Sequence, residues 1–143
     1  MPSAGVARHE EIRTSKITDA AGCAKHLCVG PGTNQSEIAK SGAAERILGV
    51  TIEAVSTQYR DQQYCCDGVV AMVAGAAINR LTDDFPTLLV TDASARVVAL
   101  SAVAGTYWVV GEMDNSSAAA AAAGDIVHML IWEEADQIVV AGS

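Results

Sequence analysis

The sequence predicts an all-β domain, a compact β-barrel or β-sandwich built from two similar units of about 60 residues. Short runs rich in Val, Ile, Leu and Thr are separated by clusters of Gly, Asn, Asp, Ser and Pro, a spacing typical of sandwiches and barrels. The 143 residues are enough for one core. Because 50% of the residues are hydrophobic but only 4% are aromatic, that core should consist of small and β-branched side chains.

The predicted strands follow one another from residue 17 onward. The clearest are Arg46–Ile52, Gly68–Val73, Thr87–Val90, Arg96–Leu100, Tyr107–Met113 and Asp125–Trp132. The last run is apolar on both faces, which predicts a central strand or a contact between subunits. The residues of this run expected at a subunit contact are Ile126, His128, Leu130 and Trp132.

Two segments are candidates for one or two short helical turns. Ala118 to Ala123 follows Asn115-Ser116-Ser117 and precedes Gly124, which are residues that cap helices. Six alanines cannot hold a helix in water alone, so this segment is expected to be a short helix or a small-residue loop packed between strands. The second candidate is Ser56 to Cys65.

Residues 1–16 have no periodic apolar pattern and are expected to form an extended N-terminal arm ahead of a β-rich domain at 17–143. Its apolar anchors are Val6 and Ile12, and its cations Arg8 and Arg13 complete the set expected to bind a partner. Such an arm either frays or becomes ordered by adding a strand to a partner's sheet.

An internal repeat with an offset of about 61 residues supports the two-unit prediction. It matches Gly49–Ser56 with Val110–Ser117, and Asp67–Val73 with Gly124–Leu130. Upstream of these, each half has a strand, a turn and a second strand. They are Lys25–Val29 and Ser36–Lys40 in the first half, and Thr87–Thr91 and Arg96–Leu100 in the second.

The charge balance argues against two classes of partner. Nine Lys and Arg against seventeen Asp and Glu give a net charge of -8, whose field repels nucleic acid and anionic membrane surfaces. The sequence shows no membrane-spanning run and no signal peptide, so we expect a soluble protein made in the cytoplasm.

The cysteines and histidines do not form a recognisable site. Cys23, Cys28, Cys65 and Cys66 fit neither a zinc motif nor a disulfide framework, so they are expected to be reduced and partly buried. A zinc site at Cys23, His26 and Cys28 would need a fourth ligand from elsewhere. A cysteine nucleophile with His128 as its base is the enzyme alternative, but nothing places the two together. We therefore expect no enzyme, no metal and no cofactor.

Exposed aromatic residues would favour a surface-displayed module that binds carbohydrate or a host protein. The candidates are Tyr59, Tyr64, Tyr107, Trp108 and Trp132, of which Tyr59 and Tyr64 are the best placed.

The order of these elements resembles the small capsid cement, or decoration, proteins of tailed bacteriophages. The resemblance is carried by FPTLLVTDASARVVALSAVAGTYWVVGEMDNSSAAAAAAGDIVHMLIW in the second half, and by IAKSGAAERILGVTIEAVS followed by DGVVAMVAGAAI in the first. The sequence departs from the family in its alanine run, its cysteines and in Asp83-Asp84-Phe85-Pro86, where similar proteins have a Gly-containing turn.

The resemblance implies a β-rich virion protein without catalytic residues. It implies that the protein binds the outer face of the completed capsid as a homo-oligomer, typically a trimer, and stabilises the shell. The expected partner is then the major capsid protein, contacted in part by the N-terminal arm. The expected location is the capsid exterior, after synthesis in the host bacterial cytoplasm.

Overall fold

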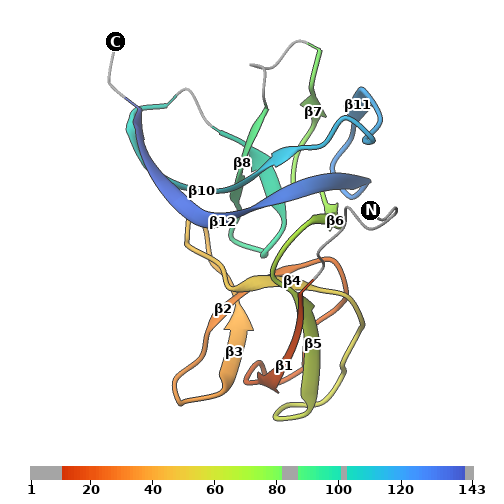
Figure 1. Ribbon diagram of the computed structural model, residues 1–143, viewed down its shortest axis with the longest axis vertical. Coiled ribbons are helices and arrows are strands. Elements are labelled where there is room, and N and C mark those ends of the chain that lie inside the picture. Colours follow the sequence, from red (N-terminus) through yellow and green to blue (C-terminus); the bar gives the residue numbers. More distant parts are fainter. Residues whose placement is uncertain (1–10, 82–86, 101–102, 141–143) are drawn as a thin grey trace.

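The computed structural model describes residues 11–81, 87–100 and 103–140, with the side chains of 133–136 excepted, and these residues form strands, turns and loops (Figure 1). The predicted all-β class is confirmed. The structure holds a closed five-stranded barrel, a five-stranded sheet and a small two-stranded sheet. No helix long and apolar enough to cross a membrane occurs among the residues described.

The first unit is the closed barrel in the lower part of Figure 1. Its strands are β1 (Ile12–Ile17), β2 (Cys28–Pro31), β3 (Glu37–Lys40), β4 (Gly49–Thr51) and β5 (Asp61–Cys65). Around the barrel their order is β1-β3-β2-β4-β5. All neighbours are antiparallel except β1 and β3, whose parallel pairing closes the barrel through Ile17 and Ile38.

The second unit lies above the first in Figure 1. Its sheet consists of β6 (Val69–Val73), β8 (Leu88–Thr91), β9 (Val97–Ala99), β10 (Gly105–Met113) and β12 (Ile126–Val140), in the order β6-β12-β10-β8-β9. The short strands β7 (Ile78–Asn79) and β11 (Ala120–Ala121) pair separately.

The two units have the same strand order and the same register. Read around each unit, β6, β9, β8, β10 and β12 take the places of β1, β3, β2, β4 and β5. A parallel bridge between Ala74 and Val97 joins the ends of the second sheet, as Ile17 and Ile38 close the first. Both closures carry the same backbone hydrogen bond. Thr18 N–H donates to Ile38 O at 2.9 Å, and Gly75 N–H donates to Val97 O at 2.7 Å.

One glycine occupies the same place in each unit. A Cβ atom on Gly49 of β4 would lie 2.4 Å from Cys65 O of β5, and a Cβ atom on Gly111 of β10 would lie 2.4 Å from Leu130 O of β12. Real Cβ atoms do not come that close to a carbonyl oxygen, so both positions require glycine. The repeat is therefore present in the backbone and in one shared packing constraint.

The structure corrects how the repeat is aligned. Gly49 corresponds to Gly111, one residue beyond the predicted match to Val110. The predicted match of Asp67–Val73 with Gly124–Leu130 is wrong. The strands β6 and β12 are neighbours in one sheet, and they take different places in the repeat, those of β1 and β5. The strand β6 opens the second unit instead of closing the first.

Neither candidate helix forms, and most of the alanine run is the small-residue loop expected as its alternative. Residues Asp61–Cys65 are β5, and alternate side chains there, Gln62 and Tyr64, are buried. In the alanine run, Ala120 and Ala121 form β11, which pairs with Asn79 and Ile78. Pairing with another strand supplies backbone hydrogen bonds that a helix of six residues would have to supply alone.

The predicted boundary between arm and domain at residue 16 is wrong. Residues 12–17 form β1, which pairs with β5 over five positions and belongs to the barrel. The expectation that Ile12 and Arg13 lie in an arm is therefore corrected. Val6 and Arg8 lie outside the described residues.

One core cluster crosses the junction between the units. It joins Cys28, Val50 and Cys65 of the barrel to buried residues of the second sheet. Backbone hydrogen bonds reinforce this contact, from Cys28 N–H to Ala95 O at 2.8 Å and from Val73 N–H to His26 O at 3.2 Å. The two units thus share a hydrophobic core.

Thr91 connects the two units through its hydroxyl and its carbonyl. The hydroxyl donates to Gly42 O at 2.7 Å and accepts from Glu45 N–H at 3.0 Å. The carbonyl accepts from Ala44 N–H at 2.9 Å. Because Thr91 is only 2% exposed, water cannot readily replace these partners. We call this contact between Thr91 and the turn at 42–45 the clasp.

Replacing Thr91 by Val removes the hydroxyl and keeps the side-chain shape. Gly42 O and Glu45 N–H then lose a partner at a buried site, so the free energy of unfolding should fall by about 1–3 kcal/mol in urea titrations. The control is Thr14→Val on the exposed surface of β1, expected to change it by less than about 0.5 kcal/mol. Equal values for the two variants would contradict the clasp.

Candidate interaction surfaces

Three of the four residues expected at a subunit contact lie together on the outer face of β12. Ile126 and Leu130 are 48% and 37% exposed, and His128 lies half-buried between them. The alternate residues Val127, Met129 and Ile131 point inward and are buried. Trp132 is half-buried and lies where the pairing of β10 with β12 shifts register.

The neighbouring strand β6 extends this apolar surface. Val73, Ala71 and Val69 are paired with Ile126, His128 and Leu130 respectively, and all three are half-buried. Side chains paired across two strands share one face of a sheet. The outer face of β6 and β12 is therefore a continuous apolar strip, which we call the β12 strip, and its role as a subunit contact stays a prediction.

A polar turn borders the β12 strip at His128. The Nδ1 atom of His128 lies 3.1 Å from Ser116 Oγ, and Ser116 also hydrogen-bonds the carboxylate of Asp114. The backbone N–H of His128 donates to Ser117 Oγ at 2.6 Å. These bonds hold the turn against β12. They also lower the pKa of Asp114, chiefly through the Ser116 hydroxyl and N–H.

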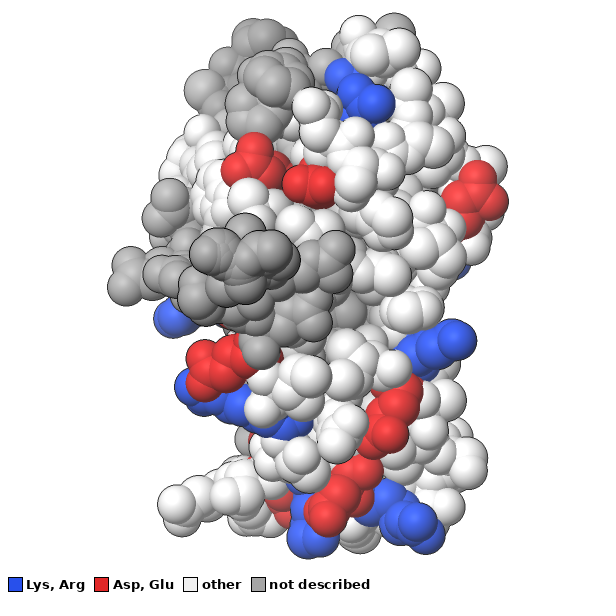
Figure 2. Space-filling view, turned by 45° about the vertical axis from the view of Figure 1, so that its right-hand side comes forward, with Lys and Arg blue, Asp and Glu red and all other residues white. Residues whose placement is uncertain are grey.

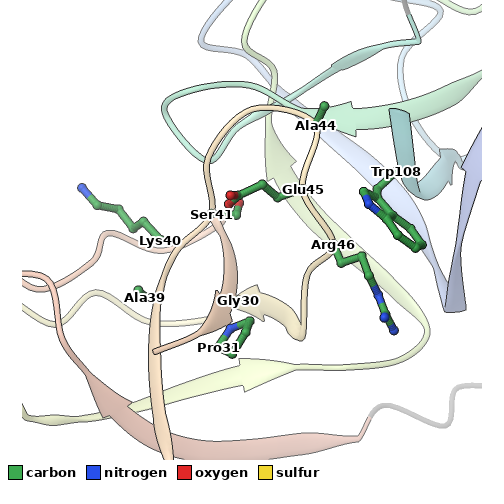
Figure 3. A pocket seen from close by; sticks show the side chains of 9 residues that line it. All are labelled: Gly30, Pro31, Ala39, Lys40, Ser41, Ala44, Glu45, Arg46 and Trp108. Atoms are coloured by element: carbon green, nitrogen blue, oxygen red, sulfur yellow. The ribbon is translucent and has the colours of Figure 1, made fainter. Parts of the chain in front are cut away.

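An open groove of about 440 Å³ lies at the junction of the two units (Figure 3). Its lining residues are Gly30, Pro31, Ala39, Lys40, Ser41, Ala44, Glu45, Arg46 and Trp108. The first eight belong to the barrel and its turn at 41–46, and Trp108 belongs to β10. We call this the junction groove.

Arg46 and Trp108 are in contact along one side of the junction groove. The guanidinium carbon of Arg46 lies 5.0 Å from the centre of the Trp108 ring, a cation–π contact. The ion pairs among the described residues are Arg13–Glu11, Lys16–Asp61 and Arg96–Asp92. Arg46 and Lys40 therefore have no carboxylate partner within the described part of the chain.

The junction groove could not be predicted from the sequence, because the residues that line it come from distant segments. Trp108 is about 60 residues from the turn that carries Arg46, and no local pattern signals their contact. Of the two aromatic residues predicted to be best placed for ligand binding, Tyr64 is buried and its hydroxyl is hydrogen-bonded to that of Ser15. Tyr59 is 55% exposed. Tyr107 is half-buried, and its hydroxyl donates to Val103 O.

All four cysteines are free thiols, and three are buried. Burial raises the pKa of Cys23 to about 11 and also raises those of Cys28 and Cys66. A raised pKa disfavours the thiolate that a nucleophile or a zinc ligand requires. Within the described residues, no three His, Cys, Asp or Glu side chains form a group that could hold a metal ion.

Arg13, expected to bind a partner, is engaged within its own segment. Its guanidinium donates two hydrogen bonds to Glu11 Oε1, at 2.7 and 3.0 Å. The bond and charge of Glu11 raise the pKa of Arg13. Ile12 pairs with Cys65 and is 51% exposed.

Comparison with known proteins shows a shared fold. No protein-family model matches the chain, and no curated protein matches its sequence. In structure, the chain is similar to the head fiber gp8.5 N base of bacteriophage phi29, with a TM-score of 0.58. The similarity covers 88% of this chain and 97% of that one at 15% sequence identity.

The pKa of Asp114 depends on Ser116, so Ser116→Ala should raise it toward the ordinary aspartate value of about 3.9. In the wild type the folded pKa is the lower one. The contact therefore stabilises the fold above the unfolded pKa and is lost as pH falls through the folded pKa. A ¹³C NMR titration of the Asp114 carboxyl measures this. Ser56→Ala, a serine of the first unit, should leave the Asp114 pKa unchanged.

The thiols should react slowly in the native protein. We expect Cys66, which is half-buried, to be alkylated first by iodoacetamide at pH 7, and Cys23, Cys28 and Cys65 to react only on unfolding. Mass spectrometry of time points measures this order. A rapidly alkylated native thiol would contradict it and revive the cysteine-enzyme alternative.

Proposed function

We propose that this chain is a structural protein of a bacteriophage virion that binds the outer surface of the assembled capsid and stabilises the shell. The observation that carries the proposal is the fold shared with a phage head fiber base over 88% of the chain. The order of sequence elements, which resembles capsid cement proteins, supports it independently.

The physical basis of such stabilisation is mass action. A protein that binds the assembled shell but not its loose subunits stabilises the shell by its binding free energy at every site. The rigid junction between the two units suits this role, because a body that does not deform on binding loses little entropy. Its partner in this proposal is the major capsid protein.

A homo-oligomer on the shell is part of the proposal, and a trimer is the expected form. The β12 strip supports it, since a contiguous apolar face rimmed by polar residues is typical of a protein contact. Ile126, His128 and Leu130 would lie in that contact. Val6 and Arg8 stay as the predicted capsid contacts of the N-terminal segment.

The base of a head fiber is a second candidate function. It is favoured by the same structural similarity, because the phi29 protein is described as the N base of such a fiber. Both candidates place the protein on the capsid exterior. They differ in whether this protein also supports a fiber that extends outward from the capsid.

The test is to mix the purified protein with undecorated, expanded capsids. We expect co-sedimentation in a saturable ratio and a higher temperature of capsid disruption, because binding favours the assembled state. A variant without residues 1–10 keeps all of β1 and should fold but bind more weakly.

Absence of co-sedimentation by the full chain would overturn the proposal. Equal binding by the variant without residues 1–10 would overturn only the assignment of Val6 and Arg8. A shell that binds the protein without gaining thermal stability would favour the fiber-base candidate.

A further inference from the structure

We propose that the junction groove is the site where this protein takes up an acidic segment of the shell protein, with a carboxylate bound by Arg46. The inference rests on the proposed capsid binding. It adds the site and the chemistry of the contact.

The groove has the form of a site for an extended segment. In Figure 3, Arg46 and Trp108 lie along one side, Gly30 and Pro31 lie at the bottom, and Lys40 extends outward at the opposite end. The groove is open, so an occupant can enter from the side without unfolding either unit. Its volume of about 440 Å³ is sufficient for a few residues of polypeptide.

The charges in the groove favour an anionic occupant. Arg46 and Lys40 lack carboxylate partners within the described residues, although the chain has an excess of acids. The carboxylate of Glu45, also in the lining, accepts a hydrogen bond from Gly42 N–H and is engaged in its own turn. The nine lining residues thus carry two positive side chains and one negative one.

The distribution of charge along the chain makes this groove unusual. Residues 67–143 contain two Lys or Arg and ten Asp or Glu, so the whole net charge of -8 comes from them. Residues 1–66 are balanced, with seven of each sign. Figure 2 shows Lys and Arg beside Asp and Glu over the lower part of one face. The junction groove is therefore a locally positive site beside an acidic unit.

Trp108 prepares Arg46 for a carboxylate. The guanidinium carbon of Arg46 lies over the ring of Trp108, and the N–H groups at the edge of a guanidinium can donate two parallel hydrogen bonds to a carboxylate. The contact places the guanidinium over one ring face of Trp108. A sugar ring that stacked on that face would have to displace Arg46, and this favours a protein segment over a carbohydrate.

The internal repeat supplies a second argument for a polypeptide occupant. By register, Pro31 in β2 corresponds to Thr91 in β8, because Pro31 is paired with Ile38 and Thr91 with Val97. At Thr91 the clasp binds a turn of polypeptide, residues 42–45, through three hydrogen bonds. At Pro31 the equivalent position lines the open groove. Pro31 has no hydroxyl, so of these three bonds only the one accepted by the carbonyl has an equivalent in the groove.

The test compares Arg46→Ala with wild type for binding to undecorated, expanded capsids. Because charge-assisted hydrogen bonds would be lost, Arg46→Ala should bind roughly tenfold to a hundredfold more weakly. Arg46→Lys keeps the charge but lacks the planar fork, and should fall between the two. The matched control is Arg60→Ala, which removes an exposed arginine from the same barrel outside the groove.

The outcomes separate this inference from the proposed function. If wild type binds capsids and Arg46→Ala binds them as tightly as wild type and Arg60→Ala do, the groove is not the site, and capsid binding stands. If wild type does not bind, both proposals fail. Urea unfolding of each variant shows whether its fold is intact. If Arg46→Ala changes self-association in sedimentation velocity but leaves capsid binding unchanged, the occupant is a second copy of this chain, which overturns the shell segment.

Discussion

The parallel contact that closes each five-stranded sheet is the constraint on which the rest of the structure depends. Apart from β10 and β12, the strands of these sheets have only three to six residues, and an open sheet of such short strands would leave too many backbone groups unpaired at its edges. Pairing of Ile17 with Ile38 removes the edges of the first sheet, and the bridge from Ala74 to Val97 joins those of the second. Tight closure also brings β4 near β5 and β10 near β12, where only Gly49 and Gly111 fit.

Small side chains are a consequence of this closure. The interior of a narrow barrel has little room, and the buried residues are chiefly Val, Ile, Ala, Cys and Met, with Tyr64 as the buried aromatic among those described. The low aromatic content of the sequence follows from that geometry. Because each unit alone has a small core, the cluster that spans the junction supplies much of the packing that holds the units together.

Much of the fold could be predicted from the sequence, because strands with turn residues between them are local patterns. The strands β3, β8 and β9 lie within predicted strands, and β2 overlaps its predicted strand at Cys28 and Val29. The outward-facing Ile126 and Leu130 follow from alternation along β12. For the alanine run the sequence left a short helix and a small-residue loop open, because local propensity contains no information about the partner strand β7. The repeat was misaligned because Val- and Gly-rich strands match one another at several offsets. The Arg46–Trp108 contact is set by tertiary folding, so no local pattern could reveal it.

The connection between the units has a mechanical consequence. Only Cys66, Asp67 and Gly68 separate β5 from β6, and the clasp and the shared core join the same two bodies elsewhere. Two bodies joined at several separated points cannot pivot about a single hinge. The distance and angle between any surface on the barrel and any surface on the second sheet are therefore fixed. If two subunits of a partner assembly bound one to the barrel and one to the second sheet, their spacing would be fixed. Strain applied at one of these contacts would then be transmitted directly to the other.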